Sequence, residues 1–358
     1  MATDFVDSAR HWSSAQTAAD VRIVRLVHLP ADRPPWTGTG LHMAAGTEYS
    51  LFAGGRVHWS PHRPTLYGGP RHHLWARLSP GGRIVNSTGD SGTFVADVDG
   101  ELELCIYMGM WKNEHGDLAT PTSLYRHLSG GLDVLAVVWQ DGAAVALERA
   151  AAVGAPPFIG TELERLKSAP SVPVGWSYLL ETGQASIFAD AVGPSGEPTI
   201  AVDSRDDQGI VCKAVEAALT PQTRLRWRWR VTEHPSELAE DRAQTHDYVS
   251  VATEFDNGRD LTWIWSSRLP PGTHFHCPVR AWTERETHWV VRSGRADLGL
   301  WCTEEREVYA DVRSAMGEPP SHIVRVWLIA VSSFQHGTAR AEFSDIVLSD
   351  GGSTLRVL

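Results

Sequence analysis

The chain contains 358 residues, of which 32 are Lys or Arg and 43 are Asp or Glu, so that its formal net charge is -11. This charge repels a phosphate backbone, and we expect no nucleic-acid partner. Hydrophobic residues make up 42% of the chain and charged residues 21%, which is typical of a folded globular protein and excludes extensive disorder. The length exceeds that of one ordinary β-sandwich and predicts two domains.

The N-terminal segment has no secretory or membrane pattern. It carries Asp4, Asp7, Arg10 and His11 where a signal peptide has a basic and then an apolar region. No run of roughly 18 apolar residues occurs along the chain. We therefore expect a cytoplasmic protein that does not enter a membrane.

The cysteines are too far apart to form a recognisable motif. They are Cys105, Cys212, Cys277 and Cys302. This spacing predicts reduced thiols and indicates neither a disulfide framework nor a zinc knuckle.

Residues 1–20 are polar and rich in Ala and Ser, which predicts a loose tail or a short helix. Short β-branched and aromatic runs, separated by Gly, Pro, Asn and Asp, then recur through residues 21–149 and predict one β domain. The strands expected in it are Val21 to His28, Glu48 to Ala53, Arg56 to Ser60, Leu74 to Leu78, Gly92 to Val98, Leu102 to Met108 and Val134 to Gln140.

Residues 150–175 are rich in Ala, Pro and Gly and are expected to link the two domains. One short helix is predicted inside this linker. Thr161 and Glu164 have the spacing of a capping box, which would start that helix.

Residues 176–358 repeat the β pattern and predict a second sandwich. Its expected strands are Ser186 to Asp190, Thr199 to Val202, Ile210 to Ala214, Leu225 to Val231, Asp247 to Phe255, Leu261 to Ser266, Thr287 to Arg292, Ile323 to Ser332 and Ala341 to Leu348. A helix that starts at an N-cap Thr303 and stops at Gly317 is expected to cover one end. The predicted fold class is all-β, with two jelly-roll-like β-sandwich domains.

The strongest local signal is a β-hairpin centred on Asn257-Gly258, a pair that favours a two-residue type I′ turn. With that turn, strand alternation places an aliphatic set on one face. The opposite face would carry rings, a hydroxyl and a carboxylate: Tyr248, Ser250, Glu254, Trp263 and Trp265. We interpret this face as the aromatic lining of a small-molecule pocket, and the alternative is a second packed layer.

Arginines alternate with tryptophans from Leu225 to Val231, which places Arg228 on a face opposite the rings. Such a row is typical of a solvated face, but it could also bind Glu254 or an anionic group of a ligand. Arg292 is likewise a candidate for substrate binding. We predict the binding residues to be Tyr248, Ser250, Trp263, Trp265, Arg228 and Arg292.

Four ionisable residues near these strands are candidates for proton transfer. They are His246, Glu254, Glu286 and His288. A histidine or a buried carboxylate can titrate near neutral pH, which general acid–base catalysis requires.

No nucleotide-binding or metal-binding motif is present, so we expect neither a cofactor nor a metal ion. His72 and His73 are interpreted as a surface pair. The loop from Trp111 to Asp117 holds oxygen ligands and could take a calcium ion.

Glycine-rich and aromatic segments recur in the N-terminal half, at Pro35 to Gly40, Ala45-Gly46, Tyr49 to Gly55, Gly68 to Pro70 and Gly100 to Leu104. With these segments the N-terminal half resembles galactose-binding-type jelly rolls, in particular the bacterial galactophilic lectin. The likeness covers about Val21 to Trp139, and the calcium-and-sugar loop of the lectins is replaced here by Trp111 to Gly130. It implies a β-sandwich of a kind that often binds sugars.

A second set of segments lies in the C-terminal half, at Trp227 to Val231, His246 to Tyr248, Glu254 to Gly258, Arg285 to His288, Val290 to Gly294 and Val308 to Asp311. With these segments the C-terminal half resembles an uncharacterised bacterial β-sandwich family of unknown function, over about Trp176 to Leu348. The likeness implies a fold and no mechanism.

Three functions remain open from the sequence. The first is a cofactor-independent enzyme, a cyclase or lyase of specialised metabolism, acting on a polycyclic, polyketide-like or sugar-like small molecule. The second is a carbohydrate-active protein, either a hydrolase with paired carboxylates such as Glu254 and Glu286 or a sugar binder. The third is an interaction protein without chemistry.

Overall fold

The computed structural model describes residues 2–15, 21–140, 142–242 and 248–358. The chain divides into two compact units, Met1–Ala169 (unit 1) and Pro170–Leu358 (unit 2). Both are built mainly from antiparallel sheets, and the predicted all-β class is confirmed. No helix among the described residues is long and apolar enough to cross a membrane.

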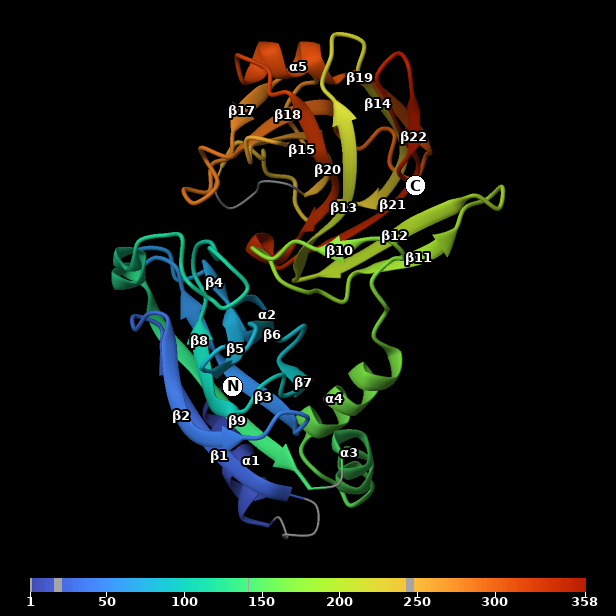
Figure 1. The fold of residues 1–358 in the computed structure, drawn as a ribbon. Helices are drawn as coiled ribbons and strands as arrows, with labels where there is room; N and C mark the ends of the chain where they lie inside the picture. The colour runs from blue at the N-terminus through green and yellow to red at the C-terminus, as the bar shows by residue number, and fades with distance from the viewer. Residues whose placement is uncertain (1, 16–20, 141, 243–247) are drawn as a thin grey trace. The chain divides into compact units, whose positions relative to one another are not determined.

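Unit 1 contains two sheets with a layer of helices on one of them (Figure 1). The helices are α1 Ala2–Ser14, α2 Pro70–His73, η1 Thr122–His127, α3 Ala143–Ala152 and α4 Pro157–Ser168. The five-stranded sheet has the order β1-β9-β3-β4, with β7 also paired to β3, and the four-stranded sheet has the order β2-β8-β5-β6. The strands are β1 Val21–Pro30, β2 Trp36–Met43, β3 Glu48–His58, β4 Tyr67–Gly68, β5 Leu74–Ser79, β6 Val85–Asn86, β7 Ser91–Val95, β8 Gly100–Ile106 and β9 Ser129–Trp139.

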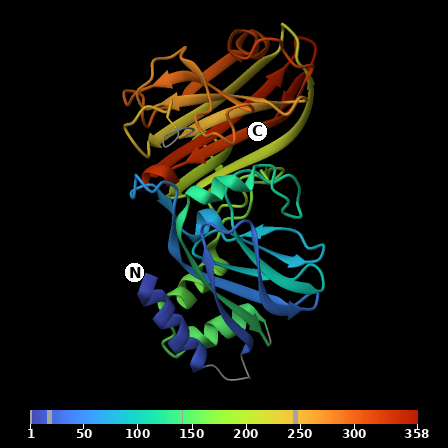
Figure 2. The same ribbon diagram turned by 90° about the vertical axis from the view of Figure 1, so that its left-hand side faces the viewer.

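Each face of the five-stranded sheet buries its own apolar cluster. Leu51 and Val134 belong to the cluster shared with Leu102 and Leu104 of the four-stranded sheet. On the opposite face, Phe52 and its neighbours on β9 pack with buried residues of α1, α3 and α4, which lie together in Figure 2. Successive side chains of these strands point to opposite faces of the sheet, and both faces are buried. The strands therefore appear in the sequence as continuous apolar runs.

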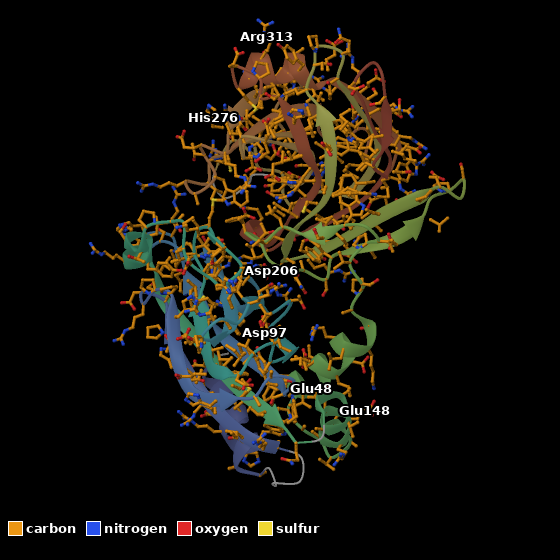
Figure 3. The ribbon with its side chains drawn as sticks, viewed as in Figure 1. Glu48, Asp97, Glu148, Asp206, His276 and Arg313 are labelled. Atoms are coloured by element: carbon orange, nitrogen blue, oxygen red, sulfur yellow. The ribbon has the colours of Figure 1, made fainter. Side chains whose placement is uncertain are left out.

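Residues 150–175, the predicted linker, contain the end of α3 and the whole of α4. Ile159 and Leu163 of α4 are buried in unit 1. The predicted capping box is wrong, because α4 begins at Pro157, where proline suits the first turn, and the Thr161 hydroxyl donates within the helix to the Pro157 carbonyl. The start of α3 is held by Glu48, labelled in Figure 3, whose Oε2 accepts from the Ala143 N–H at 2.5 Å.

Glu162 of α4 is completely buried and anchors the helix to unit 1. Its carboxylate accepts from Arg165 at 2.6 and 2.7 Å and from the hydroxyls of Ser91 and Thr93 at 2.6 Å each. We expect Glu162→Ala to lower the free energy of unfolding by about 2–3 kcal/mol, because it leaves several buried hydrogen-bond donors without an acceptor. Urea unfolding measures this loss. The exposed Glu164→Ala on the same helix is the control and should change stability by less than about 0.5 kcal/mol; equal effects of the two variants would contradict the assignment.

His73, predicted to lie on the surface, is buried in unit 1 as a neutral ring. It accepts from Trp59 Nε1 at 2.9 Å and donates from Nδ1 to the Tyr107 carbonyl at 2.9 Å. Burial lowers the pKa of His73 to about 3. In the unfolded chain its pKa is about 6.5, so acidification protonates the unfolded state first and destabilises the fold.

The stability that His73 contributes is therefore fully present above pH 6.5 and is lost as the pH falls towards 3. We expect the difference in unfolding free energy between the native protein and His73→Gln to shrink by up to about 1.4 kcal/mol per pH unit in this window. Urea unfolding of both proteins between pH 7 and 5 measures the difference. Parallel pH dependences would show that His73 takes up its proton in the folded state.

Unit 2 is a sandwich of a seven-stranded and a six-stranded sheet. The seven-stranded sheet has the order β10-β13-β20-β15-β16-β18-β17, and the six-stranded sheet has the order β11-β12-β21-β14-β19, with β22 paired to β21. The strands are β10 Ser177–Tyr178, β11 Phe188–Val192, β12 Pro198–Arg205, β13 Gln208–Ala218, β14 Arg224–Glu233, β15 Val249–Phe255, β16 Asp260–Ser266, β17 His274–His276, β18 Glu286–Ser293, β19 Cys302–Glu307, β20 His322–Val331, β21 Thr338–Ser349 and β22 Thr354–Arg356.

Two further helices belong to unit 2. They are α5 Val308–Ala315 and η2 Ser333–Gln335. The helix predicted from Thr303 starts later, because Cys302–Glu307 pairs with β14 as strand β19. Helix α5 covers one end of the sandwich, as expected (Figure 1).

The core of unit 2 lies between its two sheets and is rich in large rings. Trp227 and Trp229 of β14 meet Trp263 and Trp265 of β16, with ring centroids 5.8 and 5.5 Å apart. The face of the seven-stranded sheet that is turned away from this core, here called the outer face, carries a second, smaller apolar cluster around Trp327 and Ile329.

Candidate functional site

The hairpin of β15 and β16 forms as predicted, but its register differs by one residue. Gly258 has a φ of +76°, and Phe255 N–H donates to the Arg259 carbonyl, so the loop holds three residues instead of two. A type I turn followed by a left-handed glycine is the common three-residue solution. Val251 consequently lies opposite Trp263, and Glu254 lies opposite Asp260.

This shift moves the tryptophans to the other side of the sheet, because side chains alternate with a period of two. Trp263 and Trp265 share the core face with Val249 and Val251 and are 0% exposed. The prediction that they share a face with Glu254 is wrong. The predicted aromatic pocket is therefore part of the core, and neither ring is placed to contact a ligand.

The other predicted binding residues of the hairpin are also enclosed. Tyr248 is 2% exposed, and its ring lies 6.3 Å from that of His234. Burial raises the pKa of Tyr248, so its phenol stays neutral. Ser250 is 0% exposed and lies on the outer face, paired with Ile264 and Ile329. His246 lies outside the described residues.

Both predicted arginine ligands bind carboxylates of the protein itself. Arg228 lies on the six-stranded sheet, away from Glu254, and its Nη1 is 3.2 Å from Asp345 Oδ2. Arg292 contacts Glu304 at 2.8 Å and Asp297 at 2.5 Å. Of the two interpretations of the arginine row, a solvated face therefore describes Arg228 better than contact with Glu254 does.

The outer face of the seven-stranded sheet instead carries a row of charged residues that the sequence did not reveal. Arg325 of β20 pairs with Glu254 of β15, Glu254 pairs with Asp260 of β16, and Asp260 pairs with Glu286 of β18. Because paired residues on neighbouring strands point the same way, the four side chains stand side by side. Glu254 and Glu286, predicted as catalytic, thus lie in one row.

Arg285 crosses this row and binds several of its carboxylates. Its Nη2 is 3.4 Å from Glu254, its Nε is 3.8 Å from Asp260, and its Nη1 donates at 2.6 Å to Glu181, which follows β10. Burial lowers the pKa of Arg285, but these carboxylates, Glu181 first, more than compensate and hold the pKa above its usual value. The guanidinium is therefore a permanent cation within the cluster.

Glu254 receives two further donors. Arg325 Nη1 lies at 3.1 Å and the indole Nε1 of Trp327 at 3.2 Å from its Oε2. Charge-assisted hydrogen bonds of this kind fix a carboxylate in position. The Arg285 guanidinium also lies 5.1 Å from the rings of both Trp282 and Trp327, which brings two aromatic rings to the same place.

One end of the row is accessible and the other is closed. The exposed fraction of the side chain is 44% for Arg325, 9% for Glu254 and 0% for Asp260. Glu181 and Arg285 are 17% and 15% exposed, and Trp282 is partly exposed. Exposure of the side chains therefore increases along the row from Asp260, through Glu254, to Arg325.

The closed end holds the other two predicted catalytic residues. Glu286 and His288 are 2% and 0% exposed, and His288 Nε2 lies 3.5 Å from Glu286 Oε2. Cys277 approaches both of them. The sequence marked Glu286 and His288 as ionisable residues near the predicted strands, but the approach of Cys277 depends on how β17 folds back onto β18.

The loop of unit 1 that could take calcium is closed by its own hydrogen bonds. Asn113 Oδ1 accepts from the amides of His115 and Asp117, and Asn113 Nδ2 donates to Asp117 Oδ2 at 2.9 Å. These side chains stabilise the turn around Gly116, and calcium at this loop stays an untested prediction.

Residues 190–347 match the model of a family described as a protein of unknown function (DUF3047). The match contains Glu254, Asp260, Glu286 and His288 of the outer face. It confirms the predicted resemblance of the C-terminal half to an uncharacterised domain family. No curated protein matches the chain in sequence.

Three solved structures illustrate what the fold is similar to. The first is the N-terminal domain of EclA, a PllA-like lectin, at 17% identity and a TM-score of 0.26, covering 34% of this chain and 99% of that one. The second is the xyloglucanase domain of NopAA, a type three effector from Sinorhizobium fredii, in complex with cellobiose, at 11% identity and a TM-score of 0.28, covering 50% and 99%. A mutant of salicylate 1,2-dioxygenase from Pseudoaminobacter salicylatoxidans matches at 11% identity and a TM-score of 0.14, covering 98% and 87%.

Proposed function

We propose that unit 2 is a carbohydrate-active enzyme that hydrolyses a glycosidic bond with Glu254 and Glu181. The observation that carries this proposal is that both carboxylates bind the same guanidinium, Arg285, at the accessible end of the charged row. Glycoside hydrolysis requires two carboxyl groups at a fixed separation, one as acid and one as nucleophile or base.

The separation of the two carboxylates does not exceed what that chemistry allows. Glu181 contacts one terminal nitrogen of Arg285 at 2.6 Å, and Glu254 contacts the other at 3.4 Å. Since these nitrogens are joined through one carbon atom, the two contacting oxygens are at most about 9 Å apart, which is below the upper limit of roughly 9.5 Å for the carboxyl groups of a glycosidase.

The surroundings of the pair suit a sugar. Trp282 and Trp327 flank Arg285. Trp327 is fully buried, whereas the partly exposed indole of Trp282 provides a flat surface for the apolar face of a pyranose. Arg325 and the carboxylates supply donors and acceptors for hydroxyl groups. A molecule that combines hydroxyls with flat apolar faces satisfies both kinds of group.

The cyclase or lyase interpretation was based on an aromatic pocket at the β15–β16 hairpin, which the fold does not form. It required the rings of Trp263 and Trp265 to line a pocket, and both are core residues. The accessible groups near Glu254 are mostly charged, which disfavours an apolar polycyclic substrate.

The test is a hydrolysis screen of the purified full chain against aryl glycosides and polysaccharides that cover α- and β-linkages, with detection of new reducing ends. We expect cleavage of at least one linkage class, and we expect both Glu254→Gln and Glu181→Gln to slow it by about 10²- to 10⁴-fold. Glu342→Gln is the matched control, because Glu342 binds Arg230 on the other sheet. Absence of hydrolysis across the screen, or cleavage at an unchanged rate in both variants, would overturn the proposal.

A further inference from the structure

Three side chains with different metal-binding atoms converge at the closed end of the charged row. Glu286 and His288 are two residues apart on β18 and therefore point to the same face. Cys277 directly follows β17, after His276, which is labelled in Figure 3. The Cys277 N–H donates to the Glu286 carbonyl at 2.9 Å, which brings the thiol next to the strand.

The thiol sulfur, one imidazole nitrogen and one carboxylate oxygen all lie within 4.8 Å of one another. Cys277, Glu286 and His288 are 1%, 2% and 0% exposed. From this geometry we infer that the three residues bind one divalent metal ion of the zinc class. This site goes beyond the proposed hydrolysis, which uses Glu254 and Glu181.

The ligand set indicates the class of ion. Zinc is bound by Cys sulfur at about 2.3 Å, by His nitrogen at about 2.0 Å and by carboxylate oxygen at about 2.0–2.2 Å. In a tetrahedral site the ligand atoms are then roughly 3.3–3.8 Å apart, so shifts on the order of 1 Å bring the three atoms into position. A set that includes a soft thiolate disfavours magnesium and calcium, which prefer oxygen.

The charges of the ligands suit a divalent ion. In the metal-bound form the deprotonated thiol of Cys277 and the carboxylate of Glu286 would together carry two negative charges. A divalent cation compensates both, and its binding requires the deprotonated thiolate. The ion would tie Cys277 to β18 and so fix the segment between β17 and β18, which carries Trp282 and Arg285.

Metal binding by the purified full chain tests the inference without any enzyme assay. Metal-free protein is titrated with Co²⁺ and with Zn²⁺, and bound metal is counted by mass spectrometry. We expect one ion per chain and a sulfur-to-cobalt charge-transfer band in the near ultraviolet. Cys277→Ser should remove the band and weaken Co²⁺ binding more than about tenfold. Cys212→Ser is the control, because Cys212 is another buried cysteine of the same sheet, and it should leave the band unchanged.

A second measurement uses the unsubstituted protein and does not depend on the folding of a variant. Zn²⁺ should slow alkylation of Cys277, mapped by peptide mass spectrometry, and leave the alkylation rate of Cys212 unchanged. Failure to bind either metal, or a charge-transfer band that persists in Cys277→Ser, would overturn the inference. Metal binding without glycoside cleavage would refute only the proposed function, and cleavage without metal binding would refute only the metal site.

Discussion

Glu254→Gln is expected to lower kcat on any glycoside that the protein cleaves by about 10²- to 10⁴-fold. The amide keeps the shape of the side chain but can neither attack an anomeric carbon nor transfer a proton. Because Arg325, Arg285 and Trp327 all donate to this carboxylate, the amide also weakens three contacts. The measurement is kcat and KM of the purified variant beside the native protein.

The effect of Glu254→Gln on stability must be measured separately from its effect on catalysis. Arg285 retains Glu181 and Asp260 as partners, so we expect a loss of only about 1–2 kcal/mol in unfolding free energy. Thermal unfolding monitors this loss. Full activity in a variant that is folded at the assay temperature would contradict a catalytic role for Glu254.

Trp263→Ala is expected to lower the free energy of unfolding by about 3–5 kcal/mol. The side chain is fully buried between the two sheets of unit 2, packs against Trp227 and donates its Nε1–H to Asp311 Oδ2 at 2.9 Å. Truncation leaves a cavity and removes a partner of a buried carboxylate. Denaturant unfolding of unit 2 measures the effect.

Trp282→Ala provides the contrast, because Trp282 lies beside Arg285 on the outer face and is partly exposed. It should cost less stability than Trp263→Ala and raise KM for a cleaved glycoside. The conservative Trp263→Phe should leave KM unchanged. If Trp263→Phe raised KM while Trp282→Ala did not, the ligand would have to lie on the core side of the hairpin.

Much of the fold is predictable from the sequence because strand signals are local. The runs Leu225 to Val231, Leu261 to Ser266 and Ile323 to Ser332 all fall within observed strands or end one residue beyond them, since β-branched and aromatic residues alternate or cluster between turn residues. Helix ends were predicted less well. Pro157 starts α4 four residues before the predicted capping box, because a proline at the first turn is an equally good start signal.

The predicted binding site was wrong because the loop of the β15–β16 hairpin was assigned the wrong length. Asn257-Gly258 is compatible with a two-residue and with a three-residue loop, and only the second places Glu254 opposite Asp260. A shift of one residue exchanges the faces of a strand, so the correct hairpin gave the wrong pocket. Glu286 and His288 were both candidates from the sequence, but their neighbours depend on the parallel pairing of β16 with β18, which no local pattern reports.

The central claim is that ligands of unit 2 bind at the outer face of the seven-stranded sheet, beside Glu254. The most direct measurement is a crystal structure of Glu254→Gln with the oligosaccharide that the native protein cleaves. We predict a sugar ring against Trp282, with its glycosidic oxygen between residue 254 and Glu181. Sugar bound instead on the arginine face of the six-stranded sheet, near Arg228 and Trp301, or only in unit 1, would contradict the claim.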